Sequence, residues 1–529
     1  MARAAALAFA VIAVNLAAAP YDWHAISWIA YAPFIAATID LQPRRAAAVG
    51  WLYGVVATGT LFSWLVDTIV LFSNIPAIGA WGVLLLFGMA FGSPYALLGM
   101  APGILRRRLG SGWVLAFAAT WVLVEYLWSF IVLFPYYHGV TLWRFPATLQ
   151  IVSVTGIWGL SFLVVWVNAA VVEAGSRRIW GPLLAPAWTW VAVTCWGAWR
   201  VTEIERTLVN APTVRLAQLQ TEVGMVERMA GSSSDIFADW SSLTAAVPPG
   251  AADLIVWPEG GCPYDMNAGK AADAVAEMAR RTGAAMVVGG GTRQRIPDPA
   301  MGEDRVRHFN SVFFLDATGK TLGRYDKMVP LPFGEYLPLA ETFPILADWI
   351  QGPGNFRAGT VPVVAELGVA NVAAPICYEA ILGRFCRNFP TADLLVNGTN
   401  DAWYGDTAGP HQHAMLAAIR ATELGVPLIR SAYTGVSFVV EPHGHVLYET
   451  DLFERVARIV TVRKAHLPTL YAKLGDWFVA ACAIGLALSW RLSSQTPARR
   501  APHATPKGGA LGGGCKDEGD PKGPPAPAR

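Results

Sequence analysis

The segment AAPICYEAIL (residues 373–382) places a cysteine where a short apolar strand is expected to end. The run Val369–Ile376 has the composition of a buried strand, and a helix is expected to follow through Glu379. A thiol at such a turn is either an inert apolar residue or a nucleophile. A nucleophile needs a base that takes its proton, and no histidine lies within thirty residues of Cys377. The base must then come from a distant part of the chain.

Two further reactive side chains follow predicted strands in the same way. Glu259 ends the run LIVWPE (residues 254–259), and Lys327 ends TLGRYDK (residues 321–327). Strands that end at a common edge of one sheet would bring a carboxylate, an ammonium and a thiol together. Glu259 could then take the thiol proton as a general base, and Cys377 could attack an acyl carbonyl and hold the acyl group as a thioester.

Lys327 has two expected roles in this arrangement. It could favour the thiolate, and it could later stabilise an oxyanion beside a backbone N–H of the turn after Cys377. A favoured thiolate predicts that Cys377 reacts with iodoacetamide well below about pH 8. The same reasoning predicts slower alkylation after Lys327→Ala, with the negative charge of Glu259 acting against the thiolate.

These segments belong to a predicted α/β domain at residues 209–465. Apolar runs bounded by turn residues predict its strands: TVRLAQLQ, ADLIVWPE, AAMVVGGG, NSVFFLD, VANVAAPIC and ADLLVNGTN. Amphipathic stretches predict helices at Gly269–Thr282 and Gln412–Leu424, and glycine turns predict hairpins in FLDATGKTLGRY and FVVEPHGHVLYE. The mixture indicates a sheet covered by helices, with reactive groups where the strands end.

The overall composition indicates contact with lipid. Of the 529 residues, 54% are hydrophobic and only 15% are charged, whereas soluble chains have about a quarter charged residues. The net charge of +2 argues against a nucleic-acid-binding surface. The six cysteines have neither CxxC nor metal-ligand spacing, so they predict no disulfide framework and no zinc site.

Apolar residues concentrate before residue 200 and in one late segment. The predicted spans are approximately 4–19, 25–41, 46–70, 79–104, 113–134, 148–172, 182–199 and Trp477–Trp490. The first span resembles a secretory signal peptide, but we interpret it as a retained helix because further spans follow at once. Ionisable residues inside the spans are few, and Glu125 is the clearest of them.

The charges between the spans predict an orientation. Arginines fall in alternate loops: Arg3, Arg44 and Arg45, Arg106 to Arg108, and Arg177 with Arg178. The positive-inside rule assigns these loops to the cytoplasm, so seven crossings bring the α/β domain to the outer side and an eighth returns the chain. The predicted organisation is a membrane region at 1–208, the α/β domain at 209–465, a membrane helix at 466–492 and a disordered tail at 493–529.

Four separated motifs resemble the nitrilase, or carbon–nitrogen hydrolase, superfamily: WPEGGCP (257–263), YDKMVPLPFGEYLP (325–338), ICYEAILG (376–383) and NDAWYGDTAGPHQH (400–413). With the membrane spans, they resemble more narrowly the apolipoprotein N-acyltransferase family, over nearly the whole chain. The resemblance implies a nitrilase-like αββα sandwich outside a bundle of membrane helices. It matches Glu259, Lys327 and Cys377 to a catalytic triad. It also matches a set of supporting or substrate-binding residues: Glu335, Tyr378 and Glu379, with Trp403 and Tyr404 in a loop that gates substrates.

The resemblance implies an acyltransferase of lipoprotein maturation. Cys377 would take an acyl chain from a glycerophospholipid, and the α-amino group of the diacylglyceryl-cysteine of an apolipoprotein would then attack the thioester, in a ping-pong sequence. The expected location is the bacterial inner membrane, with the catalytic domain on the periplasmic side, and the expected state is a monomer. No metal or nucleotide cofactor is expected, because the sequence has no P-loop, dinucleotide fingerprint or zinc spacing. A site at the membrane surface would keep the acyl chains in lipid, since exposing them to water costs about 0.8 kcal/mol per CH₂.

Three alternatives stay open on the sequence alone. The same triad could transfer the acyl group to water, which would make the chain a membrane-anchored amidase that hydrolyses a lipid amide. The chain could instead be a transporter or a non-catalytic lipid-binding protein, although few ionisable residues lie in the spans. Finally, His411 or His413 could form a Cys–His dyad with Cys377, although GPHQHAM is typical of a helix start.

Overall fold

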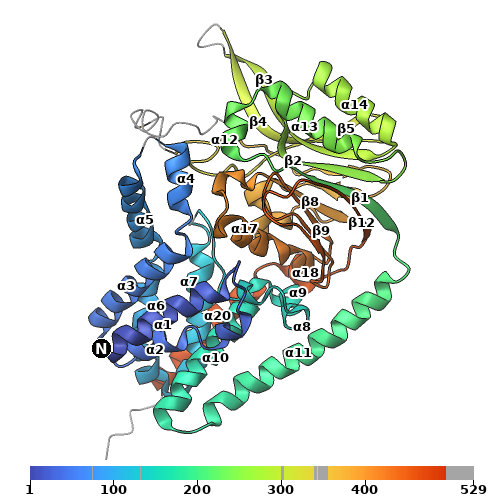
Figure 1. The fold of residues 1–529 in the computed structure, drawn as a ribbon. Coiled ribbons are helices and arrows are strands. Elements are labelled where there is room, and N and C mark those ends of the chain that lie inside the picture. Colours follow the sequence, from blue (N-terminus) through green and yellow to red (C-terminus); the bar gives the residue numbers. More distant parts are fainter. Residues whose placement is uncertain (74, 132, 299–302, 339–341, 343–355, 496–529) are drawn as a thin grey trace, which may run out of the picture.

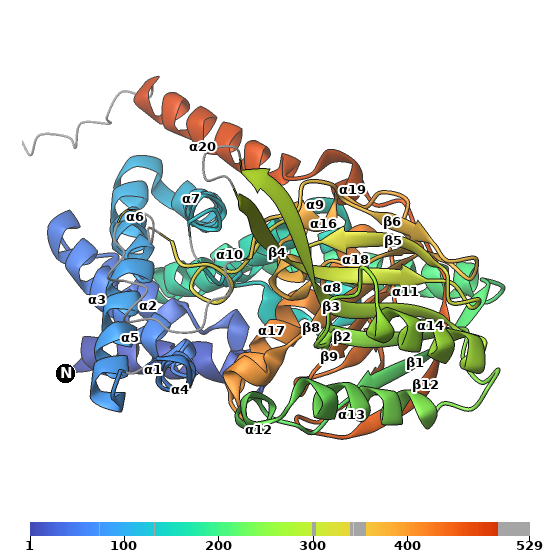
Figure 2. The same ribbon diagram turned by 90° about the horizontal axis from the view of Figure 1, so that it is seen from above.

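The computed structural model of the chain has a helical part and an α/β part (Figure 1). It describes residues 1–73, 75–131, 133–298, 303–338, 342 and 356–495. The tail predicted to begin at residue 493 therefore lies outside the described residues from residue 496 on. Seen from above, the helical part lies beside the α/β part, and α17 lies between them (Figure 2).

The helical part comes from the N-terminal sequence and from one C-terminal helix. Its elements are α1 (Ala2–Ala17), η1 (His24–Trp28), α2 (Ala32–Thr38), α3 (Pro43–Leu61), α4 (Leu65–Phe72), α5 (Ala77–Phe91), α6 (Pro94–Leu109), η2 (Gly110–Gly112), α7 (Trp113–Trp128), η3 (Val140–Leu142), α8 (Pro146–Leu149), α9 (Val152–Thr155), α10 (Ile157–Arg177), α11 (Gly181–Leu208), α19 (Leu470–Leu474) and α20 (Trp477–Gln495). Most of the predicted spans correspond to helices in this set. The predicted span 25–41 contains only η1 and the seven-residue α2, because Pro33 has no N–H to donate and is placed in the first turn of a new helix.

Glycines let the predicted spans at 46–70 and 79–104 pack closely. A Cβ on Gly99 of α6 would lie 2.5 Å from the carbonyl oxygen of Ala46 in α3, and one on Gly92 would lie 2.4 Å from the backbone of Gly54. Helices in lipid associate through such small residues, because the apolar surroundings give little driving force for association. Together, α5 and α6 therefore run antiparallel to α3 and pack against it.

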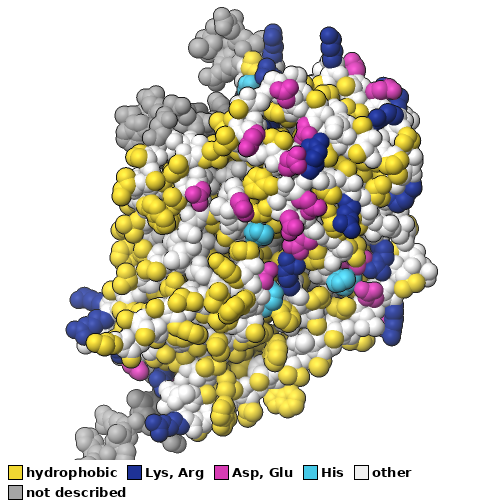
Figure 3. Space-filling model, viewed as in Figure 1, with side chains coloured by type: hydrophobic (Ala, Val, Ile, Leu, Met, Phe, Trp, Pro, Cys, Tyr) yellow, Lys and Arg dark blue, Asp and Glu magenta, His cyan; other side chains and the backbone are white. Residues whose placement is uncertain are grey.

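The length and composition of several helices suit a membrane. Among the described residues, three helical stretches are long and apolar enough to cross one: Ala77–Trp128, Ile157–Arg177 and Trp477–Ser494. A fourth candidate is the pair Pro43–Leu61 and Leu65–Phe72, which is bent by 63°. Figure 3 shows hydrophobic side chains over the helical part and most acidic side chains over the α/β part. The predicted number of seven spans plus one stays a prediction.

The α/β part contains two six-stranded sheets. Its strands are β1 (Thr213–Gln220), β2 (Leu254–Cys262), β3 (Ala285–Asp298), β4 (Glu303–Leu315), β5 (Thr321–Asp326), β6 (Val364–Glu366), β7 (Asn371–Ala373), β8 (Leu394–Thr399), β9 (Leu428–Ala432), β10 (Phe438–Val440), β11 (Val446–Glu449) and β12 (Val456–Arg463). The first sheet has the order β12-β1-β2-β3-β4-β5, and the second has the order β11-β10-β9-β8-β7-β6. β1, β2 and β3 are parallel neighbours, as are β7, β8 and β9.

Apolar side chains join the two sheets face to face. Leu216, Val256 and Val287 of the first sheet share one buried cluster with Leu394 and Val396 of the second. On the other face of the first sheet, α13 (Ser233–Ala245) and α14 (Lys270–Thr282) cover a second cluster. On the far side of the second sheet lie α17 (Ala408–Ala418) and α18 (Arg420–Leu424) (Figure 1). The expected αββα arrangement of a nitrilase-like domain is therefore confirmed.

The sequence located some elements well and missed others. β1 and both hairpins, β4–β5 and β10–β11, lie where they are predicted. The strand predicted at Val369–Ile376 is wrong in length, because β7 covers only Asn371–Ala373 and Pro375 has no N–H to donate. β6, β9 and β12 are missing from the prediction, and the helix predicted at Gln412–Leu424 begins earlier and is divided between α17 and α18.

Polar contacts join the bend between α3 and α4 to the α/β part. Trp64 donates from Nε1 to Oε1 of Gln412 in α17 at 3.1 Å, and Gln412 donates from Nε2 to the carbonyl oxygen of Leu61 at 3.0 Å. Thr68 of α4 donates to the carbonyl oxygen of Trp403 at 3.2 Å. The end of the bundle near residues 61–68 therefore lies against the segments that follow β8 and contain the last predicted motif.

Candidate active site

A buried lysine with two carboxylates forms the centre of the site. Lys327 follows β5 directly and is 1% exposed. Its Nζ lies 2.6 Å from Oε2 of Glu335 and 3.2 Å from Oε1 of Glu259, which lies inside β2 and not after it as predicted, because the strand continues to Cys262. Two carboxylates around one ammonium leave a net negative charge in a space nearly closed to water. Such a site can accept a proton from an adjacent acid.

Asn310 of β4 is a site residue that the sequence analysis did not single out. Its side-chain amide donates to Oε1 of Glu259 and to Oε1 of Glu335, both at 2.6 Å. The backbone N–H of Asn400 donates to the other oxygen of Glu259 at 2.9 Å. These contacts fix the orientation of the Glu259 carboxylate from three directions, together with Lys327.

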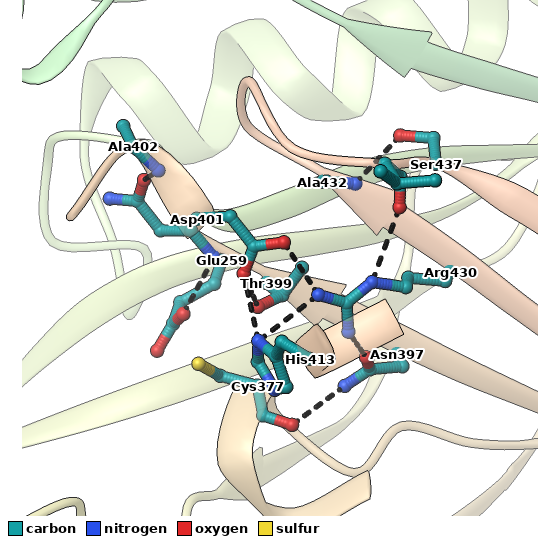
Figure 4. A network of polar contacts seen from close by, with 12 residues as sticks. Glu259, Cys377, Asn397, Thr399, Asp401, Ala402, His413, Arg430, Ala432 and Ser437 are labelled. Carbon is teal, nitrogen blue, oxygen red and sulfur yellow. Dashed lines mark hydrogen bonds and ion pairs between the residues drawn. The ribbon is translucent and has the colours of Figure 1, made fainter. Parts of the chain in front are cut away.

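Cys377 lies in a strained turn beside this centre. It is the first residue of η4 (Cys377–Ile381), and its φ of +51° is in the left-handed region that side chains other than glycine disfavour. A conformation of this kind costs about 1–3 kcal/mol and persists only where the surroundings enforce it. Figure 4 shows the Sγ of Cys377 pointing toward the side chain of Glu259. The three residues predicted as a triad are therefore brought together, while their catalytic roles stay predictions.

Glu379 joins the segment of Cys377 to the segment of Lys327 through hydrogen bonds. Its Oε1 accepts from the backbone N–H groups of Met328 at 2.6 Å and Val329 at 2.9 Å, directly after Lys327. Its Oε2 accepts from the N–H of Ile376 at 2.8 Å and from the hydroxyl of Tyr325 at 2.8 Å. The carboxyl group is fully buried and accepts from four donors. This structural role accounts for a glutamate at this position without any contact with a substrate.

The electrostatics of the site contradict one expectation from the sequence. Burial raises the pKa of Cys377 well above the usual thiol value and Glu259 raises it further, while Lys327 and a hydrogen bond with Thr399 lower it. Burial alone would lower the pKa of Lys327, but Glu259 and Glu335 together raise it well above its usual value. The expectation of a thiolate at neutral pH is therefore wrong in direction. A raised pKa favours a thiol over a thiolate at this position.

A second buried network lies behind the nucleophile turn (Figure 4). The carboxylate of Asp401 lies 2.6 Å from Nη2 of Arg430 and 2.9 Å from Nδ1 of His413. Arg430 also donates to Oδ1 of Asn397 at 2.6 Å, and the amide of Asn397 donates to the carbonyl oxygens of Pro375 and Cys377. Burial alone would raise the pKa of Asp401, but Arg430 and His413 lower it to about 2.

This network bears on the alternative Cys–His dyad. His413 is held by Asp401 and Arg430, and among the described contacts no hydrogen bond joins it to Cys377. Burial, followed by the charge of Arg430, lowers the pKa of His413. His411 is part of the same helix α17, and burial lowers its pKa as well. Glu259, and neither histidine, is among the groups that shift the pKa of Cys377, which favours Glu259 as the base.

The aromatic residues of the predicted motifs face the helical part. The ring of Tyr378 lies edge-on to that of Phe134, with centroids 5.9 Å apart. Tyr404 is buried against Trp64, with centroids 4.8 Å apart, and the ring of Trp403 packs on Phe72 at 4.2 Å. Trp403 and Tyr404 belong to η5 (Asp401–Tyr404), and their role as a gate stays a prediction.

One other group among the described residues has the chemistry of a cation site. The potential ligand atoms of Glu441, His443 and His445 lie within 4.8 Å of one another. Glu441 is already paired with Arg463 at 2.6 Å. A positive guanidinium at this position disfavours a second cation, so we assign no metal to the group.

The missed residues share a recognisable sequence pattern. Asn310, Asn397 and Arg430 are polar residues next to apolar runs in their strands: NSVFFL, LLVNGT and LIRSA. Buried polar groups need partners, so a lone amide or guanidinium in an apolar strand indicates a specific contact. The pattern does not indicate which partner is contacted, since the partners come from other strands.

Comparisons with known proteins agree with this architecture. Residues 213–467 match a family model described as carbon-nitrogen hydrolase, and residues 10–170 match one described as apolipoprotein N-acyltransferase N-terminal domain. A protein of Geobacter metallireducens named apolipoprotein N-acyltransferase is 30% identical over 480 residues, which cover 88% of this chain and 90% of that protein. One of the same name from Rhizobium meliloti is 33% identical, over 80% of this chain and 81% of its own.

Solved structures were also compared with the chain. An amidase of the nitrilase superfamily from Nesterenkonia is 18% identical and matches 52% of this chain and 98% of its own, with a TM-score of 0.36. A CN-hydrolase superfamily protein from Xanthomonas campestris is 17% identical, with a TM-score of 0.35 and coverage of 52% and 94%.

Proposed function

This chain belongs to the apolipoprotein N-acyltransferase family, and on that premise we propose that it transfers an acyl chain from a glycerophospholipid to the α-amino group of the diacylglyceryl-cysteine of an apolipoprotein. It is a membrane acyltransferase with lipid and lipoprotein substrates. The single observation that supports the chemistry best is the buried cluster of Lys327, Glu259 and Glu335 beside the strained Cys377 turn.

In the first half-reaction, Cys377 takes the acyl group. Glu259 accepts the thiol proton as Sγ attacks the ester carbonyl of the phospholipid. Lys327 Nζ and the backbone N–H of Tyr378 stabilise the oxyanion of the tetrahedral intermediate. The ester C–O bond then breaks, and Glu259 returns the proton to the leaving oxygen. The products are a thioester on Cys377 and a lysophospholipid.

In the second half-reaction, the amine of the acceptor attacks the thioester carbonyl. Glu259 takes a proton from the attacking nitrogen and returns one to the sulfur as the C–S bond breaks. An amide forms and the thiol is restored, so the cycle has no net proton change at the enzyme. Glu335 acts on this sequence through Lys327, which it holds at 2.6 Å.

The distribution of charges between the two ends of the helical bundle supports a periplasmic location for the α/β part. Arg106 pairs with Asp40 at 3.6 Å and with Glu173 at 3.5 Å, and Arg108 donates to Ser493 at 3.1 Å. These contacts gather arginine-bearing loops at one end of the helices, while residues 61–68 contact the α/β part. With the positive-inside rule, this supports an inner-membrane enzyme whose catalytic part faces the periplasm. We propose that it crosses the membrane several times and acts as a monomer.

A trapped acyl-enzyme tests the proposal directly. Purified protein incubated with phospholipid alone should gain the mass of one acyl group on the peptide that contains Cys377, and Cys377→Ser should not form a thioester. Addition of a diacylated lipopeptide should release the acyl group as a triacylated product. Release only as free fatty acid would favour the amidase alternative, and absence of any acylated Cys377 would refute the mechanism.

A further inference from the structure

A cavity lies inside the helical part, beneath the aromatic residues of the active site. It has about 770 Å³ of empty space, including space open to solvent, and its walls come from α1, α3, α5, α6, α7 and the segment around residues 134–138. Most lining residues are apolar or aromatic. Phe134 is one of them, and its ring also contacts Tyr378 at 5.9 Å and Tyr404 at 6.2 Å between centroids. The cavity therefore adjoins the residue that follows the nucleophile.

A buried carboxylate in the wall of this cavity is only half satisfied. Glu125 of α7 is 8% exposed. Its Oε1 accepts from the backbone N–H of His138 at 2.6 Å and contacts Nδ1 of the same residue at 2.7 Å. Its Oε2 is buried and has no hydrogen-bond partner among the described residues. A buried carboxylate oxygen without a donor is costly, so the position is suited to a ligand that brings one.

The basic side chain that contacts this carboxylate is the imidazole of His138. The ring of His138 also contacts two neutral groups: its Nε2 lies 2.7 Å from the hydroxyl of Tyr95, and its Nδ1 accepts from Nε1 of Trp121 at 3.2 Å. Neither lysine nor arginine occurs among the described residues that line the cavity. The rings of Trp121, Tyr136 and Phe134 surround the same space, and aromatic faces attract cations.

Two hydrogen-bonding groups that line the cavity also lack partners. The hydroxyl of Tyr136 and Nε1 of Trp128 are buried atoms without a hydrogen bond among the described residues. Both can donate to an oxygen atom. The residues that line the cavity thus include one carboxyl group and two neutral donors without a full set of protein partners, within apolar walls. This combination suits a lipid that carries both an amine and ester or phosphate oxygens.

We propose that this cavity binds the ammonium group of a lipid substrate, with its N–H donating to Oε2 of Glu125. The inference rests on the proposed function, which supplies two lipids that can carry such a group. One is an acyl donor with an amine head group, and the other is the diacylglyceryl-cysteine acceptor. The ping-pong sequence separates the two sources, because each enters a different half-reaction.

The first experiment measures both half-reactions with Glu125→Gln, which keeps the shape of the side chain and removes its charge. Acylation of Cys377 is timed with donors of identical acyl chains and ethanolamine or glycerol head groups. The isolated acyl-enzyme is then mixed with a diacylated lipopeptide or with hydroxylamine, which has no acyl chains. Because a hydrogen bond to a charged group contributes a factor of about ten or more, we expect at least tenfold slowing in one half-reaction.

The pattern of slowing identifies the source. Slower acylation of Cys377 with the ethanolamine donor but not with the glycerol donor shows that the bound ammonium group belongs to the acyl donor. Normal acylation, slow transfer to the lipopeptide and unchanged cleavage by hydroxylamine assign it to the acceptor. Glu173→Gln is the matched control, because Glu173 is a buried carboxylate of the same bundle that does not line the cavity. Wild-type rates in Glu125→Gln, or equal slowing with every substrate, would overturn the inference.

A binding measurement keeps the cavity testable if the proposed function fails. Failure of the function would appear as no acylation of Cys377 in the unchanged protein with any donor. The affinity of Cys377→Ser for a short-chain ethanolamine phospholipid and for the lipopeptide is then measured by native mass spectrometry, with the N-acetylated form of each probe as reference. At least tenfold weaker binding of one amine probe after Glu125→Gln, with its N-acetylated form unaffected, supports the inference. If Glu125→Gln leaves the binding of both amine probes unchanged, the inference is refuted.

Discussion

Nδ2 of Asn397 lies 3.2 Å from the backbone carbonyl oxygen of Cys377, so a strand of the second sheet supports the turn that contains the thiol. The same amide donates to the carbonyl oxygen of Pro375 at 2.9 Å. Its oxygen accepts from Arg430 at 2.6 Å, which fixes the orientation of the amide. A residue outside every predicted motif thus supports the backbone turn in which Cys377 has a positive φ.

Replacement of Asn397 should therefore slow acylation more than it weakens substrate binding. In Asn397→Ala the turn loses both hydrogen bonds from the side-chain amide. It can then relax toward a negative φ, which moves Sγ away from Glu259. We expect the first-order rate of acyl-enzyme formation to fall about 10- to 100-fold, since small misplacements of reacting groups have effects of this size. The apparent affinity for phospholipid should change little. Acylation reactions quenched at a series of times, over a range of phospholipid concentrations, separate the rate of acyl-enzyme formation from the apparent affinity.

Exposed Asn267→Ala is the control for replacement of an amide in the same domain. Both variants are compared by thermal unfolding, so that a loss of fold is recognised. An acylation rate for Asn397→Ala equal to that of Asn267→Ala would show that the support is unnecessary.

The alkylation of Cys377 should be slow at neutral pH. Burial and Glu259 raise the pKa of this thiol, so the thiolate fraction is small near pH 7 and increases with pH. We expect carbamidomethylation of the Cys377 peptide, followed by mass spectrometry from pH 6 to 10, to rise throughout this range. Lys327→Met should slow it further, because the positive charge that lowers the pKa is removed. A rate that is already maximal below about pH 8 would contradict the buried-thiol arrangement and restore the expectation from sequence.

The Asp401–Arg430 pair should contribute stability that is lost in acid. The folded pKa of Asp401, about 2, lies below its usual value of 3.8. Its contribution is therefore complete above about pH 4 and disappears as the pH falls toward 2. A shift of this size corresponds to about 2 kcal/mol. We expect the melting temperature of the wild type to approach that of Asp401→Asn as the pH is lowered through this window.

At neutral pH the same variant should be clearly less stable, because it leaves the charge of Arg430 buried and unpaired. Removal of one partner of a buried pair typically costs about 3–5 kcal/mol. The exposed pair of Arg206 and Glu203 provides a control, and Glu203→Gln should show neither effect. A constant difference in melting temperature between wild type and Asp401→Asn from pH 5 to pH 2 would argue against the pair.

Glu379 should show the opposite pH dependence. Burial raises its pKa from 4.5 to about 7, against Lys327 and its hydrogen-bond donors. Because the folded state holds the proton more tightly, the contribution of this titration is complete below about pH 4.5 and is lost as the pH rises through 7. The stability advantage of the wild type over Glu379→Gln should therefore shrink between pH 5 and pH 8. Thermal unfolding of both proteins at several pH values measures it, and an advantage that grows with pH would contradict the predicted sign.

The sequence singled out three residues that the fold brings together, because the signals that point to them are local. Glu259, Lys327 and Cys377 each follow an apolar run, and strand ends are where a sheet of this kind presents side chains. The division into a lipid-facing part and an α/β part followed from the uneven distribution of apolar residues. Both properties depend on neighbours along the chain, so they can be read without any knowledge of distant contacts.

Tertiary structure decided what depends on residues far apart in the chain. Asn310 contacts two glutamates, 51 and 25 residues away, and the Asn397 and Arg430 contacts join separate strands in the same manner. The pKa direction of Cys377 also depends on burial, which no local pattern measures. The sequence by itself determined which chemical groups are present and that each follows an apolar run. The packing of two sheets against a helical bundle decided their protonation, their orientation and the half-satisfied carboxylate of Glu125, because desolvation and pairing arise only where distant segments meet.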